Sequence, residues 1–534
     1  MEMARSKTFR ALIVVTILAA GDLSGRAAQT APFHNVRDYG AAGDGKAKDT
    51  APIRKAISAA ASAGGGTVYF PPGQYLTGSI HLQSNITLHL DAGAVLQFSQ
   101  DFNDYLPMVK SRWEGTECVN FAPPLYAYRA ENIAIVGRGL IDGQGKAWWD
   151  FHRKLREEVA KTGKVAAPSA WSKLFAESNQ NAASRGRWEQ MGNFLRPPMV
   201  QPFECRNVRI EGISLRDPPL WTINPVYCDN VTVTGISITN PEDSPNTDGI
   251  NPDSCRNVHI SDCHISVGDD CITIKSGRDA DGRRVGRPCE NITVTNCTML
   301  DGHGGVVIGS EMSGGVRKVA ISNCIFDGTE RGIRIETTRG RGGVIEDLRV
   351  SNIVMSRITR TPFDLNMFYE KVPPEPVSER TPALRNLHFS DITVRDAPVA
   401  GYILGLEEMP VEDVTFSNIR IEAEKGLSCS NARNVTFHDV RINTKKGPAL
   451  LCEKVEALVL DGFETLAPHK DAAVVDLKDV SGAYLFGCRA APGTEVFLQL
   501  RGPNSRDIIL QANEFGKAAA AFKMPDDFPA SAVV

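Results

Sequence analysis

Residues 205–217 read CRNVRIEGISLRD, and the same phrase returns as CDNVTVTGISITN at residues 228–240 and as CRNVHISDCHISV at residues 255–267. Each copy has a polar start, a run in which apolar and polar residues alternate, a short turn and a second alternating run. Alternation with a period of two, rich in Val, Ile and Thr, predicts β-strands, because neighbouring side chains of a strand point to opposite faces. Each copy therefore predicts two short strands joined by a turn.

The phrase repeats along much of the chain. Further copies start at residues 289, 316, 384, 411 and 432, and the asparagine of the first four copies stands at positions 207, 230, 257 and 291. The resulting steps of 23, 27 and 34 residues are typical of solenoid repeats. No helical segment separates the copies, so we predict an all-β chain that forms a single-stranded parallel β-helix over residues 29–515.

Both ends and one internal segment depart from the repeat. Asp49–Ala63 has the pattern of a helix with Ile53, Ala56, Ile57 and Ala60 on one face, and we predict that it caps the N-terminal end. Residues 143–198 form a charged, Trp-containing insertion that we expect to be helical. Residues 516–534 are expected to form a loose Ala-rich tail.

The first 28 residues have the pattern of a signal peptide. Arg5, Lys7 and Arg10 precede the apolar run Ala11–Ala20, which is too short to span a bilayer, and small residues follow. A buried N-terminal strand or an uncleaved anchor is the alternative. No later segment has the length and hydropathy of a membrane span, so we predict a secreted or periplasmic protein, and we expect a monomer.

The net charge and the cysteines indicate which kind of partner to exclude and whether disulfides are expected. The net charge of −4 over 534 residues offers no basic face, which argues against a nucleic-acid partner. Among the 12 cysteines, Cys263, Cys297 and Cys324 occupy equivalent places in their copies, which predicts a stack of buried thiols. A disulfide from Cys271 to Cys289 or Cys297 is the alternative.

Three short phrases carry more polar residues than the wall of a solenoid needs: NTDG at 246–249, GDDC at 268–271 and GHG at 302–304. Asp248 and Asp269 are 21 residues apart, close to one coil, so they are expected to lie about 4.8 Å apart on neighbouring strands. Asp269 and Asp270 can face one cleft only at a bend, which Gly268 makes feasible.

Clustered carboxylates raise one another's pKa, so one can remain protonated while another is ionised. Hydrolysis of a glycosidic bond needs that division into an acid and a base. The same residues also fit turn-forming positions or a calcium site, and His303 fits an exposed loop as well as a catalytic role.

These three phrases, followed by RGIRIET at residues 331–337, resemble the polygalacturonase family, glycoside hydrolase family 28, over about residues 33–443. The resemblance implies a right-handed parallel β-helix and an inverting hydrolase of galacturonate-containing pectic polysaccharide, without a metal or organic cofactor. By matching positions it implies Asp269 as general acid, Asp248 and Asp270 as the pair that activates water, and His303 as support for the acid. It also implies substrate contacts from Asn246, Arg334 and Tyr369.

Glu336 departs from the family pattern, which has Arg-x-Lys where this chain has Arg334-Ile335-Glu336. Residues i and i+2 of a strand share a face, so an acid stands where a base would meet the sugar carboxylate. We therefore expect Glu336 to contact the substrate and to favour a neutral sugar or a masked galacturonate, as in branched or rhamnose-containing pectin. Alternatively, Glu336 turns away and Arg339 or Arg341 takes the place of the base.

Two further expectations concern the mode of action. Trp148, Trp149, Trp171 and Trp188 of the insertion would wall off one end of the cleft and cause cutting from chain ends, unless the insertion only packs on the exterior. In an inverting enzyme, the carboxyl of Asp269 should lie about 6.5–9.5 Å from those of Asp248 and Asp270. The competing functions are a calcium-dependent pectate lyase and a non-catalytic polysaccharide-binding β-helix.

Overall fold

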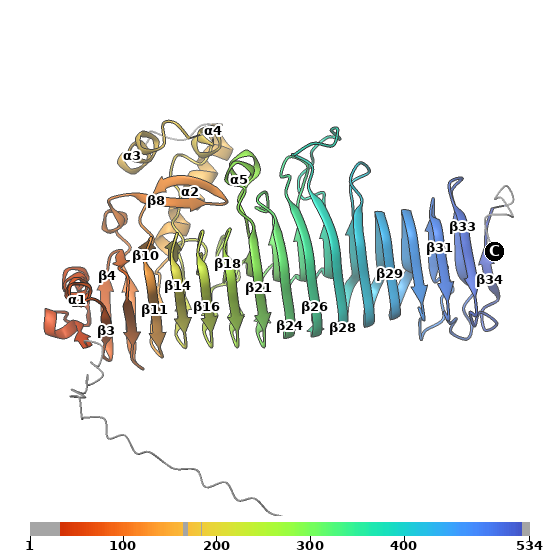
Figure 1. The fold of residues 1–534 in the computed structure, drawn as a ribbon, viewed down its shortest axis with the longest axis horizontal. Coiled ribbons are helices and arrows are strands. Elements are labelled where there is room, and N and C mark those ends of the chain that lie inside the picture. The colour runs from red at the N-terminus through yellow and green to blue at the C-terminus, as the bar shows by residue number, and fades with distance from the viewer. Residues whose placement is uncertain (1–32, 164–168, 183, 526–534) are drawn as a thin grey trace, which may run out of the picture.

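The computed structural model describes residues 33–163, 169–182 and 184–525, which form one long stack of coils (Figure 1). The predicted signal peptide lies outside these residues. Successive copies of the repeat pair in parallel, so that Val208, Val231, Val258, Ile292 and Val319 lie in register along one wall and are buried. Parallel pairing of every coil with the next confirms the predicted β-helix.

Each coil contributes strands to three walls. The first wall contains β14 (Arg206–Glu211), β16 (Asp229–Thr234), β18 (Arg256–Ser261), β21 (Cys289–Thr295) and β24 (Val316–Asp327). The second contains β15 (Ser214–Arg216), β17 (Ser237–Thr239), β19 (His264–Ser266) and β22 (Thr298–Leu300). The third contains β13 (Val200–Phe203), β20 (Asp270–Ile274), β23 (Gly304–Gly309), β25 (Arg331–Glu336) and β27 (Thr361–Asn366).

Polar side chains stack from coil to coil at the turns. The asparagines that mark the repeat all have positive φ and donate amide hydrogen bonds to one another: Asn230 to Asn207 at 3.1 Å, Asn257 to Asn230 at 3.2 Å and Asn291 to Asn257 at 3.0 Å. Asparagine tolerates this left-handed conformation better than most residues, which explains its recurrence there.

A row of alternating charge follows the same wall. Neighbours in register carry opposite signs in the order Glu131, Arg206, Asp229, Arg256, Glu290, Arg317, Glu346, Arg385 and Glu412. Arg433 continues the row through ion pairs of 2.9 Å with Glu412 and with Glu456. Cross-strand pairs of opposite charge stabilise a sheet, whereas like charges directly opposite destabilise it.

All 12 cysteines are buried free thiols, as expected for the stack of Cys263, Cys297 and Cys324. The disulfide considered for Cys271 is absent, since Cys271, Cys289 and Cys297 are all free.

The cap is confirmed as α1 (Thr50–Ser62), which buries Ile53 and its three predicted companions.

The insertion and the C-terminal end refine the predicted boundaries. The insertion folds as α2 (Lys146–Thr162), α3 (Ala170–Ser178) and α4 (Arg185–Glu189). The coils run on through β28 (Ala383–Leu404) and β29 (Val411–Asp461) to β34 (Ala520–Lys523), which pairs with β32 (Val496–Arg501). The prediction of a loose tail from residue 516 onward is therefore wrong for Ala520–Lys523, because β34 pairs with a strand of the preceding coil. Among the described residues, no helix is both long and apolar enough to span a membrane.

A hairpin of β8 (Val109–Trp113) and β9 (Thr116–Asn120) lies on the third wall over the N-terminal coils, below α3 and α4 (Figure 1). Ser111 donates to Gln201 of the wall at 2.8 Å, and Arg112 forms a buried ion pair of 2.8 Å with Asp253. An apolar cluster joins the hairpin to the insertion and to the wall through Trp113, Cys118, Phe175, Trp188, Leu195, Leu220 and Trp221. The hairpin is thus held by the wall on one side and by the insertion on the other.

Candidate active site

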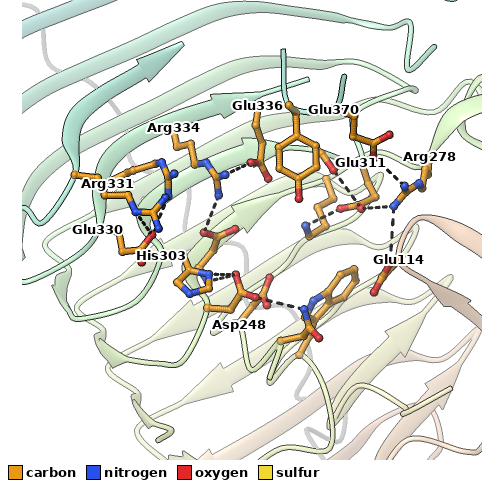
Figure 2. A pocket seen from close by; sticks show the side chains of 18 residues that line it. Glu114, Asp248, Arg278, His303, Glu311, Glu330, Arg331, Arg334, Glu336 and Glu370 are labelled. Carbon is orange, nitrogen blue, oxygen red and sulfur yellow. Dashed lines mark hydrogen bonds and ion pairs between the residues drawn. The ribbon is translucent and has the colours of Figure 1, made fainter. Parts of the chain in front are cut away.

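A pocket of about 500 Å³ opens on the third wall beside the hairpin. Strands β20, β23 and β25 provide its floor, because their outward residues face the same side of the wall. In Figure 2, Glu330 and Arg331 lie to one side of Asp248, and Glu311, Arg278, Glu370 and Glu114 lie to the other. The pocket also contains every residue that the sequence analysis assigned to the site: Asn246, Asp248, Asp269, Asp270, His303, Arg334, Glu336 and Tyr369.

The three aspartates form one cluster. One carboxylate oxygen of each of Asp248, Asp269 and Asp270 lies within 4.8 Å of the others. These oxygens are closer together than the about 6.5–9.5 Å expected between the carboxyl group of Asp269 and those of the other two. Asp248 and Asp270 occupy neighbouring coils, whose spacing of about 4.8 Å brings them together. Asp269 joins the same side because residues 268 and 269 form a bend just before β20.

Burial shapes the charge state of the cluster. Asp248 and Asp270 are almost fully buried, whereas the side chain of Asp269 is 19% exposed. Burial, reinforced by the charge of Asp269, raises the pKa of Asp248 well above its usual value and that of Asp270 to about 6. The buried oxygens Asp248 Oδ1 and Asp270 Oδ1 have no hydrogen-bond partner. The cluster thus retains protons into the mildly acidic range and has oxygens available for a ligand or water.

His303 contacts the most exposed member of the cluster. Its Nδ1 lies 3.1 Å from Asp269 Oδ1, and its backbone N–H donates to the carbonyl oxygen of Asp269 at 2.8 Å. Gly302, at φ 88°, permits this approach, since a Cβ there would lie 2.6 Å from the same carbonyl oxygen. The hydrogen bond to Asp269 raises the pKa of His303, although burial opposes the rise.

Two residues that the sequence analysis missed hold the cluster from below. Buried Arg196 donates to the side-chain oxygen of Asn246 at 2.8 Å, and Asn246 in turn donates to Asp269 at 3.4 Å. Asn251 donates to Asp248 Oδ2 at 2.8 Å. Arg196 comes from the end of the insertion and belongs to no repeated phrase, so nothing in its sequence context indicated this contact.

Arg334 and Glu336 lie side by side on β25, and neither turns away from the pocket. Arg334 Nη2 is 2.5 Å from Glu336 Oε2, and Arg334 Nη1 is 3.8 Å from Asp270 Oδ1. The ring of Tyr369, 45% exposed, lies 5.8 Å from the Arg334 guanidinium. The alternative that Arg339 or Arg341 replaces the missing base is wrong. Arg339 pairs with Glu408, Arg341 pairs with Asp279 and Glu370, and neither lines the pocket.

The hairpin side of the pocket holds a buried ion pair that the sequence analysis also missed. Lys275 lies 2.8 Å from Glu311 and 4.8 Å from the centre of the Trp221 ring. Burial disfavours the charge of Lys275, but the carboxylates of Glu311, Asp248 and Asp270 outweigh it and raise the pKa of Lys275. Lys275 directly follows the core residue Ile274, so alternation makes it an outward residue, but no motif distinguished it from an ordinary surface lysine.

The hairpin closes the pocket towards the N-terminal coils. The wall residues on that side, Gln201, Asn224, Asn251 and Asp253, are at most 1% exposed. At the hairpin tip, the Gly115 carbonyl accepts a hydrogen bond of 3.0 Å from the backbone N–H of Arg278. None of the four tryptophans predicted to wall the cleft lines the pocket, and three of them are at most 5% exposed. Their apolar surface instead packs the insertion against the coils and the hairpin.

Comparisons with known proteins identify the relatives of this chain. Residues 180–444 match the family model for glycosyl hydrolases family 28, and residues 33–124 match the model described as rhamnogalacturonase A/epimerase, pectate lyase-like. A "Probable polygalacturonase" of Vitis vinifera is 30% identical over 395 residues, which cover 72% of this chain and 73% of the relative. An "Endo-polygalacturonase" of Pectobacterium carotovorum is 28% identical, with 67% of this chain and 80% of the relative covered.

Among solved structures, a hyperthermoactive exopolygalacturonase of Thermotoga maritima aligns with a TM-score of 0.66 and 33% identity, covering 81% of this chain and 92% of that one. The relatives thus include enzymes named for internal and for terminal cutting. On the strength of the match to the family model and to these relatives, the chain belongs to glycosyl hydrolases family 28.

Proposed function

We propose that this chain hydrolyses galacturonosyl linkages of pectin and that it cuts from chain ends. The observation that carries the proposal is the cluster of three carboxylates within 4.8 Å of one another, with His303 hydrogen-bonded to the most exposed of them. Such a cluster can hold a proton on one carboxyl while another is ionised, which supplies both the acid and the base of glycoside hydrolysis.

The roles follow from exposure and from the unpaired oxygens. Asp269 is the general acid, since its carboxyl is the one that reaches the open pocket, where the leaving oxygen of a sugar chain would lie. Asp248 and Asp270 hold the attacking water between the two oxygens that lack hydrogen bonds, and the ionised member of this pair takes up its proton. His303 keeps the carboxyl of Asp269 oriented, and Asn246 contacts its other oxygen.

Terminal cutting is supported by the hairpin. A polysaccharide that crosses the third wall would need the outward residues Gln201, Asn224, Asn251 and Asp253, which are at most 1% exposed, and β8 contacts two of them, Gln201 and Asp253. A chain therefore fits only with one end directed at the hairpin tip. The names of the relatives include both modes, so this part of the proposal depends on the hairpin alone.

The proposal is tested by product analysis on polygalacturonate. We expect reducing ends to form without an ultraviolet-absorbing unsaturated product, and we expect the rate to survive a chelator. A calcium-dependent lyase would give the unsaturated product and lose activity on chelation, whereas a binding module would give no product at all. Because such a substrate lies outside the cell, the proposal also includes export of the protein.

A further inference from the structure

The pocket floor has a gap at Gly309, which lies between two charged residues. Lys275, Gly309 and Glu336 occupy one outward row on three successive strands. A Cβ on Gly309 would lie 2.1 Å from the Glu336 carbonyl oxygen, so only glycine fits there. The gap leaves the carboxylate of Glu336 in contact with the pocket beside Arg334 and Asp270.

Every cation of the pocket is already paired with a protein carboxylate. Among the described residues that line it, eight are Asp or Glu and five are Lys or Arg. The pairs are Lys275 with Glu311, Arg278 with Glu311 and Glu370, Arg331 with Glu330 and Asp364, Arg334 with Glu336, and Arg360 with Glu330. A carboxylate of a substrate would therefore meet an acidic pocket and would have to displace a protein carboxylate to gain a cation.

Two buried atoms beside the cluster lack hydrogen bonds. Arg334 Nε has no acceptor, and Glu336 Oε2, although ion-paired with Arg334, makes no hydrogen bond. One atom offers an N–H and the other a lone pair. A sugar hydroxyl, which both donates and accepts, can pair with either atom, whereas an ionised carboxylate only accepts and could pair only with Arg334 Nε.

We propose that Glu336 makes this subsite select an uncharged, hydroxyl-bearing sugar over a hexuronate, so that the preferred linkage joins galacturonate to a neutral sugar. The ring of Tyr369 beside Arg334 supplies an apolar face for that sugar. This inference rests on the proposed function, because it names the substrate of the same site.

The charge on Glu336 depends on pH. Burial raises the pKa of Glu336 to about 8, against the attraction of Arg334, and the other charged groups that act on it are Asp270, Lys275 and Glu311. Below that pH a protonated Glu336 tolerates a substrate carboxylate, and above it the carboxylates repel one another. The preference for the neutral sugar should therefore grow as pH rises through about 8.

A matched pair of substrates tests the inference. One is an oligogalacturonide, and the other is the same oligomer with some of its carboxyl groups reduced to primary alcohols, so that neutral sugars stand next to galacturonates. Rhamnogalacturonan and methyl-esterified oligomers extend the comparison to natural neutral sugars and to masked galacturonate. We expect kcat/KM of the unaltered enzyme to favour the reduced oligomer by at least about tenfold above pH 8, because like charges brought together in a site are costly.

Variants identify the residue responsible. Glu336→Gln, which keeps the shape, should lower the preference and abolish its dependence on pH, and Glu336→Lys should reverse it, chiefly through a lower KM for oligogalacturonide. Glu375→Lys makes the same change of charge outside the pocket and should leave the ratio unchanged. An unaltered ratio in both Glu336 variants, or a wild-type preference for oligogalacturonide, overturns the inference. Loss of activity on all substrates instead refutes the proposed function.

Discussion

The imidazole of His303 lies 3.1 Å from the carboxylate of Asp269 across two adjacent coils, and these two residues connect the buried aspartates to the open pocket. A proton that the cluster retains can leave towards a substrate only from the exposed Asp269.

Asp269→Asn should remove most of the turnover while the fold is retained. The amide keeps the shape of the side chain but has no acidic proton, and loss of general acid catalysis lowers the rate by about 10²–10⁴-fold. Single-turnover rates measure the loss, and an unchanged melting temperature shows that the coils are intact. Near-normal turnover in this variant would exclude Asp269 as the acid.

The product should carry the inverted anomeric configuration. The short spacing of the aspartates resembles that of retaining enzymes, but the unpaired oxygens of Asp248 and Asp270 fit a bound water rather than a single nucleophile. NMR of the first product formed distinguishes the two outcomes. If the retained anomer accumulates first, one of these aspartates attacks the sugar directly.

Replacing Asp269 by Asn should also lower the pKa of His303. The carboxylate of Asp269 stabilises the imidazolium, so its removal leaves burial, which disfavours the charged ring. In the unaltered protein, the stabilising contact is present at low pH and is lost as pH rises through the elevated pKa of His303. NMR titration of the ring, assigned with His303→Gln, provides the measurement, and an unchanged pKa would contradict the coupling.

Early digests of polygalacturonate should contain short products released from chain ends, with a slow fall in viscosity. The hairpin covers the wall on one side of the pocket, so the interior of a long chain cannot lie across it. Chromatography of the first products checks this expectation. A ladder of mixed oligomers at low conversion would show that internal segments of the polysaccharide can bind despite the hairpin.

Arg112→Met should destabilise the hairpin. The substitution leaves Asp253, 1% exposed, as a buried charge without its partner, a change that costs about 3–5 kcal/mol. Limited proteolysis between residues 109 and 120 should become faster, and the added change Asp253→Asn should restore part of the resistance. Equal proteolysis of the single and double variants would indicate that the ion pair does not hold the hairpin.

The coils and the aspartate cluster could be predicted because both depend on one period. Alternation fixes which side chains face inward, and a separation near one coil brings Asp248 next to Asp270. The shape of the pocket could not be predicted in this way. Arg112 and Asp253 meet across 141 residues, and neither stands in a motif. Contacts between an insertion and a wall follow from packing, which has no repeat to reveal it.

The packing of the tryptophans of the insertion could not be predicted from the sequence either. Their number was correctly interpreted as more than a solvated loop needs, but the apolar surface is buried between insertion, hairpin and coils instead of facing the substrate. Glu336 shows the opposite case. Its place two residues after Arg334 on a strand was enough to predict that both side chains face the pocket.

Because the charges alternate in sign from Glu131 to Glu456, this row repeats once every two coils. Deletion of the single coil that carries Arg256 would set Asp229 opposite Glu290, whereas removal of two successive coils would restore opposite signs. Within this part of the molecule, gain or loss of coils during evolution should therefore proceed in pairs. A protein engineer who lengthens the scaffold would have to count in the same way.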